Sequence, residues 1–387
     1  MISSISPSQS AWLHLLRWVA AFLVCITHVR VPLLADYSQV APQPVPIALL
    51  YSIHGFGHLA VIVFFCLSGY LVGGEVLREF LAGTFSWRKY LVKRVARIYP
   101  VYGLALLLTL ILDLTATHYF NQSGIYTAGI SAPMLQTDYA ARLTLPIGLG
   151  NLGFLQEILV PTFGSNGPLW SLAYEAWYYL LFPLLVFGCF GRMGMVWRMI
   201  IVGVLGGSVW FIGNQITLYF AIWLLGLIPV LAARWMPRRI WWPGLGILLV
   251  LGASRAKLLD EWPGFAVDAV LGVFVVLFIG ALGKHVVNVP GPVRMHRFLS
   301  DFSYSLYLVH WPFALFVSAA LNSMFGMELR SAPTVWAWGR YGLILALTYG
   351  FAFGFSRISE HHTYRIRSWL GRMMDRATGL ARGIITT

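Results

Sequence analysis

Arg17 and His28 lie eleven positions apart in one apolar stretch of the chain. On an α-helix this spacing brings their side chains to within about 20° of each other, roughly 16 Å apart along the axis. One helix face would then carry a cation near one end and a titratable base near the other, which suits general-base chemistry on an anionic substrate. The spacing leaves an alternative open. Arg17 could extend its aliphatic stem toward one membrane surface while His28 lies at the other.

Arg94 and Arg97 form a second candidate group, in a basic stretch that ends at Pro100. Residues three apart share a helical face, so both guanidiniums would lie at the same end of the following apolar run. Two guanidiniums there could bind a phosphate through paired hydrogen bonds. The alternative is that they only mark the cytosolic side of a membrane helix.

Glu175 lies in the aromatic segment 167–179, about two turns from its start. We expect its depth to resemble that of His28, where a carboxylate would orient the imidazole and raise its basicity. A structural pairing of Glu175 with Arg17 or with tyrosine hydroxyls is the alternative.

The remaining polar residues of the apolar runs favour structural roles. We expect His310 to be a core histidine bonded to a hydroxyl, and Asp301 to cap the helix that contains it. Ser68 has no adjacent base in the sequence, so it is a poor candidate nucleophile. The chain has no His and acidic pair at convincing metal-ligand spacing, no phosphate-binding loop and no dinucleotide glycine motif. We therefore expect no metal.

The elements that must position these groups are membrane helices. Hydrophobic residues make up 58% of the 387 residues and charged residues 11%, against about 25% in soluble proteins. A membrane helix needs about 20 apolar residues. Ten such runs are present: 11–30, 56–77, 96–114, 168–190, 196–213, 216–233, 240–254, 264–283, 299–321 and 335–356. Residues 145–160 are apolar but glycine-rich and include Glu157, so we expect a re-entrant or interfacial segment.

The net charge of +13 is explained by topology. Alternate connections and the tail after the last run hold 20 of the 27 Lys and Arg residues. Basic residues concentrate on the cytosolic side of membrane proteins, so the pattern predicts that both termini are cytoplasmic and indicates no nucleic-acid partner. We expect a membrane domain over residues 1–356. The tail, 357–387, has apolar residues at helical spacing over 364–384, which predicts a basic amphipathic helix on the anionic inner leaflet.

Four stretches in order along the chain together resemble acyltransferase family 3, the integral-membrane O-acyltransferases of the O-antigen acetyltransferase type. They are residues 15–21 with His28, residues 57–71 with Arg94, Arg97 and Pro100, residues 169–172 with Glu175, Tyr178, Tyr179 and Pro183, and residues 303–310 with Pro312. One departure is visible. The family often has two adjacent acids where this chain has Glu175 followed by Ala176, so any role of the second acid is missing.

The resemblance implies an all-α polytopic enzyme of a bacterial plasma membrane. It would transfer an acyl group, usually acetyl from acetyl-CoA, to a hydroxyl of a surface glycan, a glycolipid or a similar acceptor, as in polysaccharide biosynthesis. His28 would act as the general base or carry the acyl group transiently. Glu175 would orient His28 or the acceptor, and Arg17 would stabilise developing negative charge.

The same resemblance assigns further contacts. Arg94 and Arg97 would bind the phosphates of CoA arriving from the cytosol, and the acceptor would approach from the outer side. His310, Ser68, Tyr304 and Trp170 are candidates for substrate contact or for structural roles. A transporter of an anionic glycolipid or polysaccharide precursor remains the competing hypothesis, since it could use the same arginines electrostatically and the histidines as a proton relay.

Overall fold

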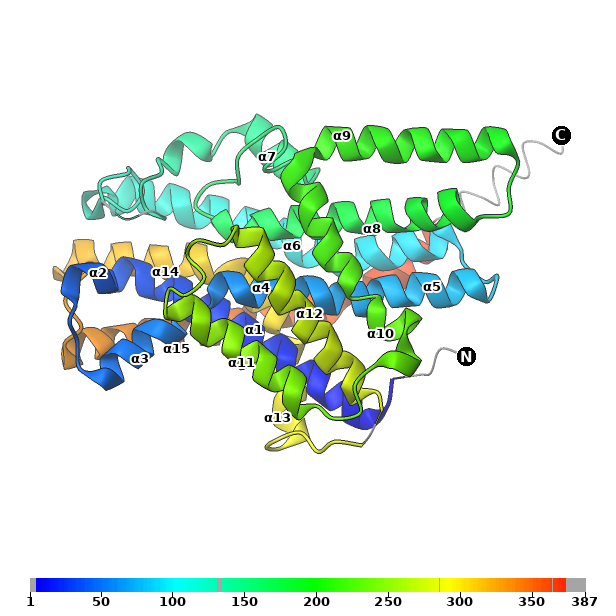
Figure 1. Cartoon of the computed structure of the whole chain (residues 1–387). Coiled ribbons are helices and arrows are strands. Elements are labelled where there is room, and N and C mark those ends of the chain that lie inside the picture. The colour runs from blue at the N-terminus through cyan, green and yellow to red at the C-terminus, as the bar shows by residue number, and fades with distance from the viewer. Residues whose placement is uncertain (1–4, 131, 133, 285, 364, 374–387) are drawn as a thin grey trace.

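The computed structural model describes residues 5–373 except 131, 133, 285 and 364. In these ranges every regular element is a helix, and the β-type contacts are isolated bridges. The protein is therefore an all-α polytopic membrane protein. Its long helices run beside one another, with α2 and α3 at one end of the bundle and α5 and α10 nearer the other (Figure 1).

The long helices follow the apolar runs of the sequence. They are α1 (Pro7–Leu33), α4 (Gly57–Ser68) with α5 (Gly74–Leu81), α6 (Trp87–Tyr119), α8 (Trp170–Phe190), α9 (Met195–Leu225), α11 (Trp241–Arg255), α12 (Gly264–Leu282), α14 (Ser303–Phe325) and α15 (Val335–Ile358). One π-helical turn, Gly69–Gly73, joins α4 to α5. The shorter helices are α2 (Tyr37–Val40), α3 (Val45–Ile53), α7 (Leu145–Leu152), α10 (Ile228–Leu231) and α13 (Val293–Asp301).

Eight helical segments of the described chain are long and apolar enough to cross a membrane. One of them, Met195–Leu231, contains two of the predicted runs. The backbone of Gly213 is non-helical there, with φ of 80°, and α9 changes direction (Figure 1). The eight segments thus account for nine of the ten predicted runs. The tenth run forms α11, which has 15 residues and is not among the eight. Each of the ten predicted runs thus has a helical counterpart.

Two boundaries differ from the sequence-based expectation. Helix α6 begins at Trp87, so the basic residues before position 96 are already helical. Asp301 does not cap the helix of His310: it is the last residue of α13, and Phe302 precedes α14. The apolar segment 145–160 was expected not to span the membrane, and its helix agrees: α7 has eight residues and is too short to cross a bilayer.

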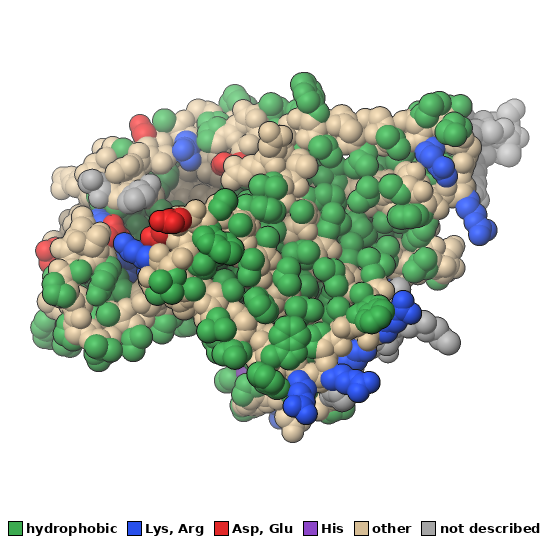
Figure 2. All heavy atoms as spheres, viewed as in Figure 1, with side chains coloured by type: hydrophobic (Ala, Val, Ile, Leu, Met, Phe, Trp, Pro, Cys, Tyr) green, Lys and Arg blue, Asp and Glu red, His purple; other side chains and the backbone are tan. Residues whose placement is uncertain are grey.

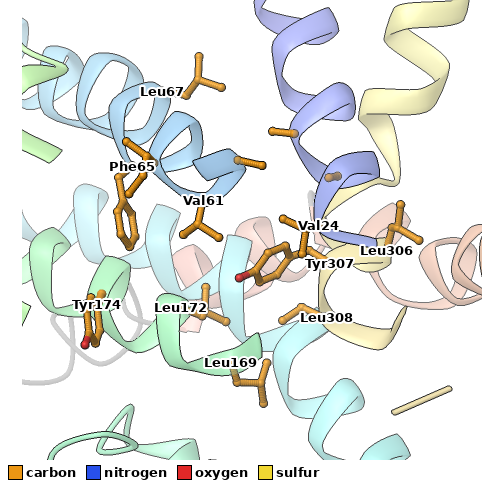
Figure 3. Packing of buried hydrophobic residues seen from close by; sticks show 14 of the residues in the cluster. Val24, Val61, Phe65, Leu67, Leu169, Leu172, Tyr174, Leu306, Tyr307 and Leu308 are labelled. Atoms are coloured by element: carbon orange, nitrogen blue, oxygen red, sulfur yellow. The ribbon is translucent and has the colours of Figure 1, made fainter. Parts of the chain in front are cut away.

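The surface and the core agree with a membrane location. Hydrophobic side chains cover the middle of the face in Figure 2, while most Lys and Arg of that face gather toward its right-hand side. Inside, α1 packs between α4 and α14, and the buried cluster there includes Val24, Val61 and Leu308 (Figure 3).

The C-terminal segment is helical over residues 365–373. The rest of the predicted amphipathic helix, from 374 onward, lies outside the described residues. Part of the described segment faces the pocket that is presented next.

Candidate active site

A pocket of about 420 Å³ lies among helices α1, α4, α6, α8 and α14. Its lining brings together most of the residues that the sequence singled out: Arg17, Ser68, Arg94, Arg97, Glu175 and Tyr304. Lys93 and Arg367 add two further cations, whereas the carboxylates of the lining are Glu75 and Glu175. The lining is therefore net cationic and suits an anionic ligand. Among the described residues, no group of three or more His, Cys, Asp or Glu is placed to hold a metal ion.

Arg94 and Arg97 share one face of α6, as their spacing predicts, and both line the pocket. Each also has a carboxylate partner. Arg94 Nη2 lies 2.7 Å from Glu75 Oε2, and Arg97 Nη1 lies 3.0 Å from Glu360 Oε1. Lys93 is a second partner of Glu75. An incoming anion would have to compete with these carboxylates for the arginines.

Three polar atoms of the lining are buried without a partner in the described part of the chain. They are Arg94 Nε, the Tyr304 hydroxyl and Thr363 Oγ1. A buried polar group without a hydrogen bond costs about 1–3 kcal/mol, and in native structures such groups commonly face a water or a ligand. The guanidinium of Arg97 lies 5.3 Å from the centre of the Tyr304 ring, which keeps that ring beside the arginines.

Glu175 faces the same pocket from α8. Its carboxylate accepts a hydrogen bond from the Tyr179 hydroxyl, one helical turn further on, at 2.5 Å. That hydroxyl is also 3.3 Å from Ser68 Oγ, which in turn accepts from Trp223 Nε1. Ser68 is thus held in a hydrogen-bond chain with Tyr179 and Trp223, and none of its partners in the described structure is a histidine.

Of the arrangements expected for Glu175, the described structure shows the pairing with a tyrosine hydroxyl and not the contact with His28. In the described structure Glu175 bonds to Tyr179, whereas the Nδ1 atom of His28 lies 2.7 Å from the Nε2 atom of His310. The two imidazole rings stack with centroids 5.0 Å apart. His310 was expected to bond to a hydroxyl; its Nδ1 instead faces the backbone carbonyls of Leu306 and Tyr307. The two histidines belong to helices far apart in the sequence, so spacing could not indicate their contact.

The histidine pair lies next to the pocket without being part of its lining. Tyr307 connects the two places, because its side chain lines the pocket and its carbonyl accepts from His310. Its hydroxyl is 2.6 Å from Ser171 Oγ, also in the lining (Figure 3 shows the Tyr307 ring between Val61 and Leu308). Tyr307 was not singled out from the sequence.

Trp170 begins α8 outside the lining. Its ring packs against Phe65 and Tyr174 at centroid distances of 6.3 and 5.0 Å. Since Phe65 belongs to the lining, Trp170 forms a second aromatic layer behind the pocket wall.

The amino-acid sequence that forms these membrane helices and the pocket between them matches a known domain. A model of the acyltransferase domain matches residues 10–357 of the chain, which is nearly its whole length. The chain belongs to acyltransferase family 3. It therefore includes a membrane acyltransferase domain, as the resemblance of the four motif stretches implied.

Two curated relatives match shorter parts of the chain. The acyltransferase MdmB of Streptomyces mycarofaciens is 32% identical over 178 residues, which is 44% of this chain and 37% of that protein. An uncharacterized protein of Haemophilus influenzae is 30% identical over 129 residues, which is 32% of this chain and 47% of that protein. The matches thus span less than half the length of either relative. No solved structure matches this chain.

Proposed function

We propose that this acyltransferase moves an acyl group, most simply acetyl, from acyl-CoA to a hydroxyl of a surface glycan, glycolipid or similar acceptor at a bacterial plasma membrane. The observation that carries the donor is the pocket. Its lining combines several cations with three buried polar atoms that have no partner among the described residues. A polyanionic donor with many acceptor oxygens would satisfy both features.

In this proposal the donor enters from the cytosol. Its phosphates are bound by Arg94, Arg97 and Lys93. When the donor arrives, these cations exchange their ion pairs with Glu75 and Glu360 for contacts with phosphate. The acyl end extends along the pocket past Arg17 and Glu175 toward Tyr307. Arg17 stabilises the negative charge that develops on the thioester oxygen during attack.

The reaction needs a base for the acceptor hydroxyl, and we assign that role to His28. The hydroxyl oxygen forms a bond to the acyl carbon while its proton passes to the imidazole. The carbon–sulfur bond then breaks, and the CoA thiolate leaves and takes up a proton. Glu175, bonded to Tyr179, lies on the donor side and would orient the donor rather than His28.

The test combines one measurement in cells and one on the purified protein. Mass spectrometry of surface glycans and lipids, with and without the protein, should reveal a mass difference of one acyl group. Purified protein in nanodiscs should bind CoA, and Arg97→Lys should weaken that binding because Lys cannot make the bidentate contact. Unchanged CoA affinity in a variant with both Arg94→Ala and Arg97→Ala would remove the donor site from this pocket.

A further inference from the structure

A second polar cluster lies where α4, α8 and α12 begin. His58 is in the first turn of α4, and its Nε2 atom lies 2.8 Å from Oδ2 of Asp268 on α12. The hydroxyl of Tyr219 on α9 donates to the same oxygen at 2.7 Å. Three helices are therefore joined at one carboxylate, outside the pocket described above.

The two ionisable side chains differ in exposure. The Asp268 side chain is 3% exposed, whereas that of His58 is 51% exposed. A buried carboxylate accepts hydrogen bonds, so the Nε2 atom of His58 is the donor, and its Nδ1 atom remains for a ligand, as an acceptor in the neutral ring and as a donor in the protonated ring. The buried acid thus holds an accessible imidazole in one orientation.

Two aromatic rings lie beside this imidazole. Trp170 stacks on it with centroids 6.4 Å apart and an interplanar angle of 19°, and Tyr219 meets it edge-on at 6.4 Å. The Trp170 ring in turn packs against Phe65, which lines the donor pocket (Figure 3 shows Phe65 near Val61 and Tyr174). Val61, almost one turn after His58, also lines the pocket. One aromatic layer therefore separates the cluster from the pocket.

We propose that His58, Asp268 and Trp170 form the subsite that binds the hydroxylated acceptor, an inference that rests on the proposed function. A sugar ring has apolar faces and hydroxyl edges. An indole face beside an oriented imidazole matches both, because binding sites combine aromatic walls with a few oriented polar groups.

The cluster lies at the predicted outer end of the bundle. The positive-inside pattern directs α4, α8 and α12 from the outer to the inner side. The acceptor would therefore meet the wall of the donor pocket from the side opposite to the arginines.

The experiment separates acceptor binding from donor use. Membrane vesicles from the host, which hold the natural acceptor, are supplied with radiolabelled acetyl-CoA. Label in glycan or lipid reports transfer, and label in free acetate reports hydrolysis by water. We expect His58→Gln and Asp268→Asn each to lower the ratio of transfer to hydrolysis about tenfold or more, with CoA affinity unchanged. His54→Gln is the matched control, since His54 also bonds to a tyrosine hydroxyl, Tyr341, near the same end.

Each outcome decides between the hypotheses. An unchanged ratio of transfer to hydrolysis in both variants would overturn the acceptor subsite. So would an equal loss of transfer and hydrolysis that follows the amount of folded protein, because a purely structural ion pair would behave in this way. A different result would overturn the proposed function, and the subsite with it: wild-type vesicles that put no more label into glycan, lipid or free acetate than vesicles lacking the protein.

Discussion

The Nδ1 atom of His28 lies 2.7 Å from the Nε2 atom of His310, so α1 and α14 share a hydrogen bond between two imidazoles. The Nδ1 atom of His310 faces the carbonyls of Leu306 and Tyr307 at 3.0 and 2.8 Å. Carbonyls only accept, so this nitrogen carries the proton of the neutral ring, and Nε2 is the acceptor. His28 must then donate from Nδ1, which leaves its Nε2 lone pair free. His310 therefore selects the nitrogen of His28 that can take up a proton.

This relationship predicts different effects of substitution at the two histidines. His28→Gln cannot take up a proton, so it should lower acetyl transfer by about 10²–10⁴-fold. His310→Ala only removes the group that orients His28, so a smaller loss of about 10–100-fold is expected. His310→Gln offers a carbonyl acceptor and should recover part of it. Transfer from radiolabelled acetyl-CoA measures all three, with CoA affinity as the control. An active His28→Gln beside a folded, inactive His310→Ala would move the base to α14.

Local patterns were sufficient for most of the fold. The ten apolar runs determine the helices because a backbone in the bilayer must satisfy its own hydrogen bonds, and a helix does so within one segment. The polar pair Asn214 and Gln215 separates two of these runs, and the helix breaks beside it, at Gly213. Asp301 shows that a single residue type does not locate a helix boundary. Its residue type favours an N-cap, but the chain continues α13 through it and turns at Phe302.

The candidate site was predictable only where it depends on one helix. The spacing of Arg94 and Arg97 predicted their common face, and the bond of Glu175 to Tyr179, one turn away, is the tyrosine pairing that the sequence left open. The contact of His28 with His310 joins residues 282 positions apart, and no periodicity encodes it. Assigning Glu175 to His28 failed for this reason.

The close crossing of α9 with the π-helical turn after α4 predicts sensitivity at Gly69. A Cβ atom there would lie 1.9 Å from the backbone oxygen of Trp223, which cannot move alone. Gly69→Ala should therefore destabilise the protein by about 1–3 kcal/mol. Gly103 on α6 has no atom within 4 Å of its Cβ position, so Gly103→Ala is the control and should be neutral or stabilising. Thermal unfolding in detergent compares the two, and equal midpoints would contradict the crossing.

The predicted orientation can be tested by cysteine labelling. Tyr126 is fully buried and unsuitable, whereas Thr127 beside it and Thr84 between α5 and α6 are exposed. Each is changed to Cys after Cys189, which is exposed, is replaced by Ser. A membrane-impermeant maleimide should label Thr127→Cys from outside intact cells and Thr84→Cys only after permeabilisation. The reverse pattern would invert the topology, and with it the sides assigned to donor and acceptor.

Asp36, between α1 and α2, predicts a stability change at acidic pH. Burial opposes its ionisation, but hydrogen bonds and positive charge from Arg330 and Arg30 outweigh this and hold the pKa of the carboxyl below its ordinary value. A depressed folded pKa stabilises the protein above the unfolded pKa of about 3.9, and this contribution is lost as the pH falls through the folded pKa. The side chain is 34% exposed, so we expect no more than about 1 kcal/mol. Unfolding midpoints between pH 6 and 3 should fall less steeply in Asp36→Asn; parallel curves would contradict this contribution.

The pairing of Arg97 with Glu360 predicts a variant that binds the donor more tightly. The Glu360 side chain is 6% exposed, and its second oxygen accepts a hydrogen bond from Ser305 at 2.8 Å. Glu360→Gln keeps an acceptor for Ser305 while removing the charge that competes with a phosphate for Arg97. Affinity for CoA should rise about threefold to tenfold, which corresponds to about 0.7–1.4 kcal/mol.

Calorimetric titration of CoA into nanodisc-embedded protein measures this effect. Glu328→Gln changes the net charge equally at an exposed position outside the lining, so its affinity should stay at the wild-type value. The gain in Glu360→Gln should also shrink as salt rises, because it arises from an unpaired cation meeting phosphate. Weaker CoA binding in Glu360→Gln would instead show that the carboxylate holds Arg97 in its binding position, and that the tail completes the donor site rather than competing for it.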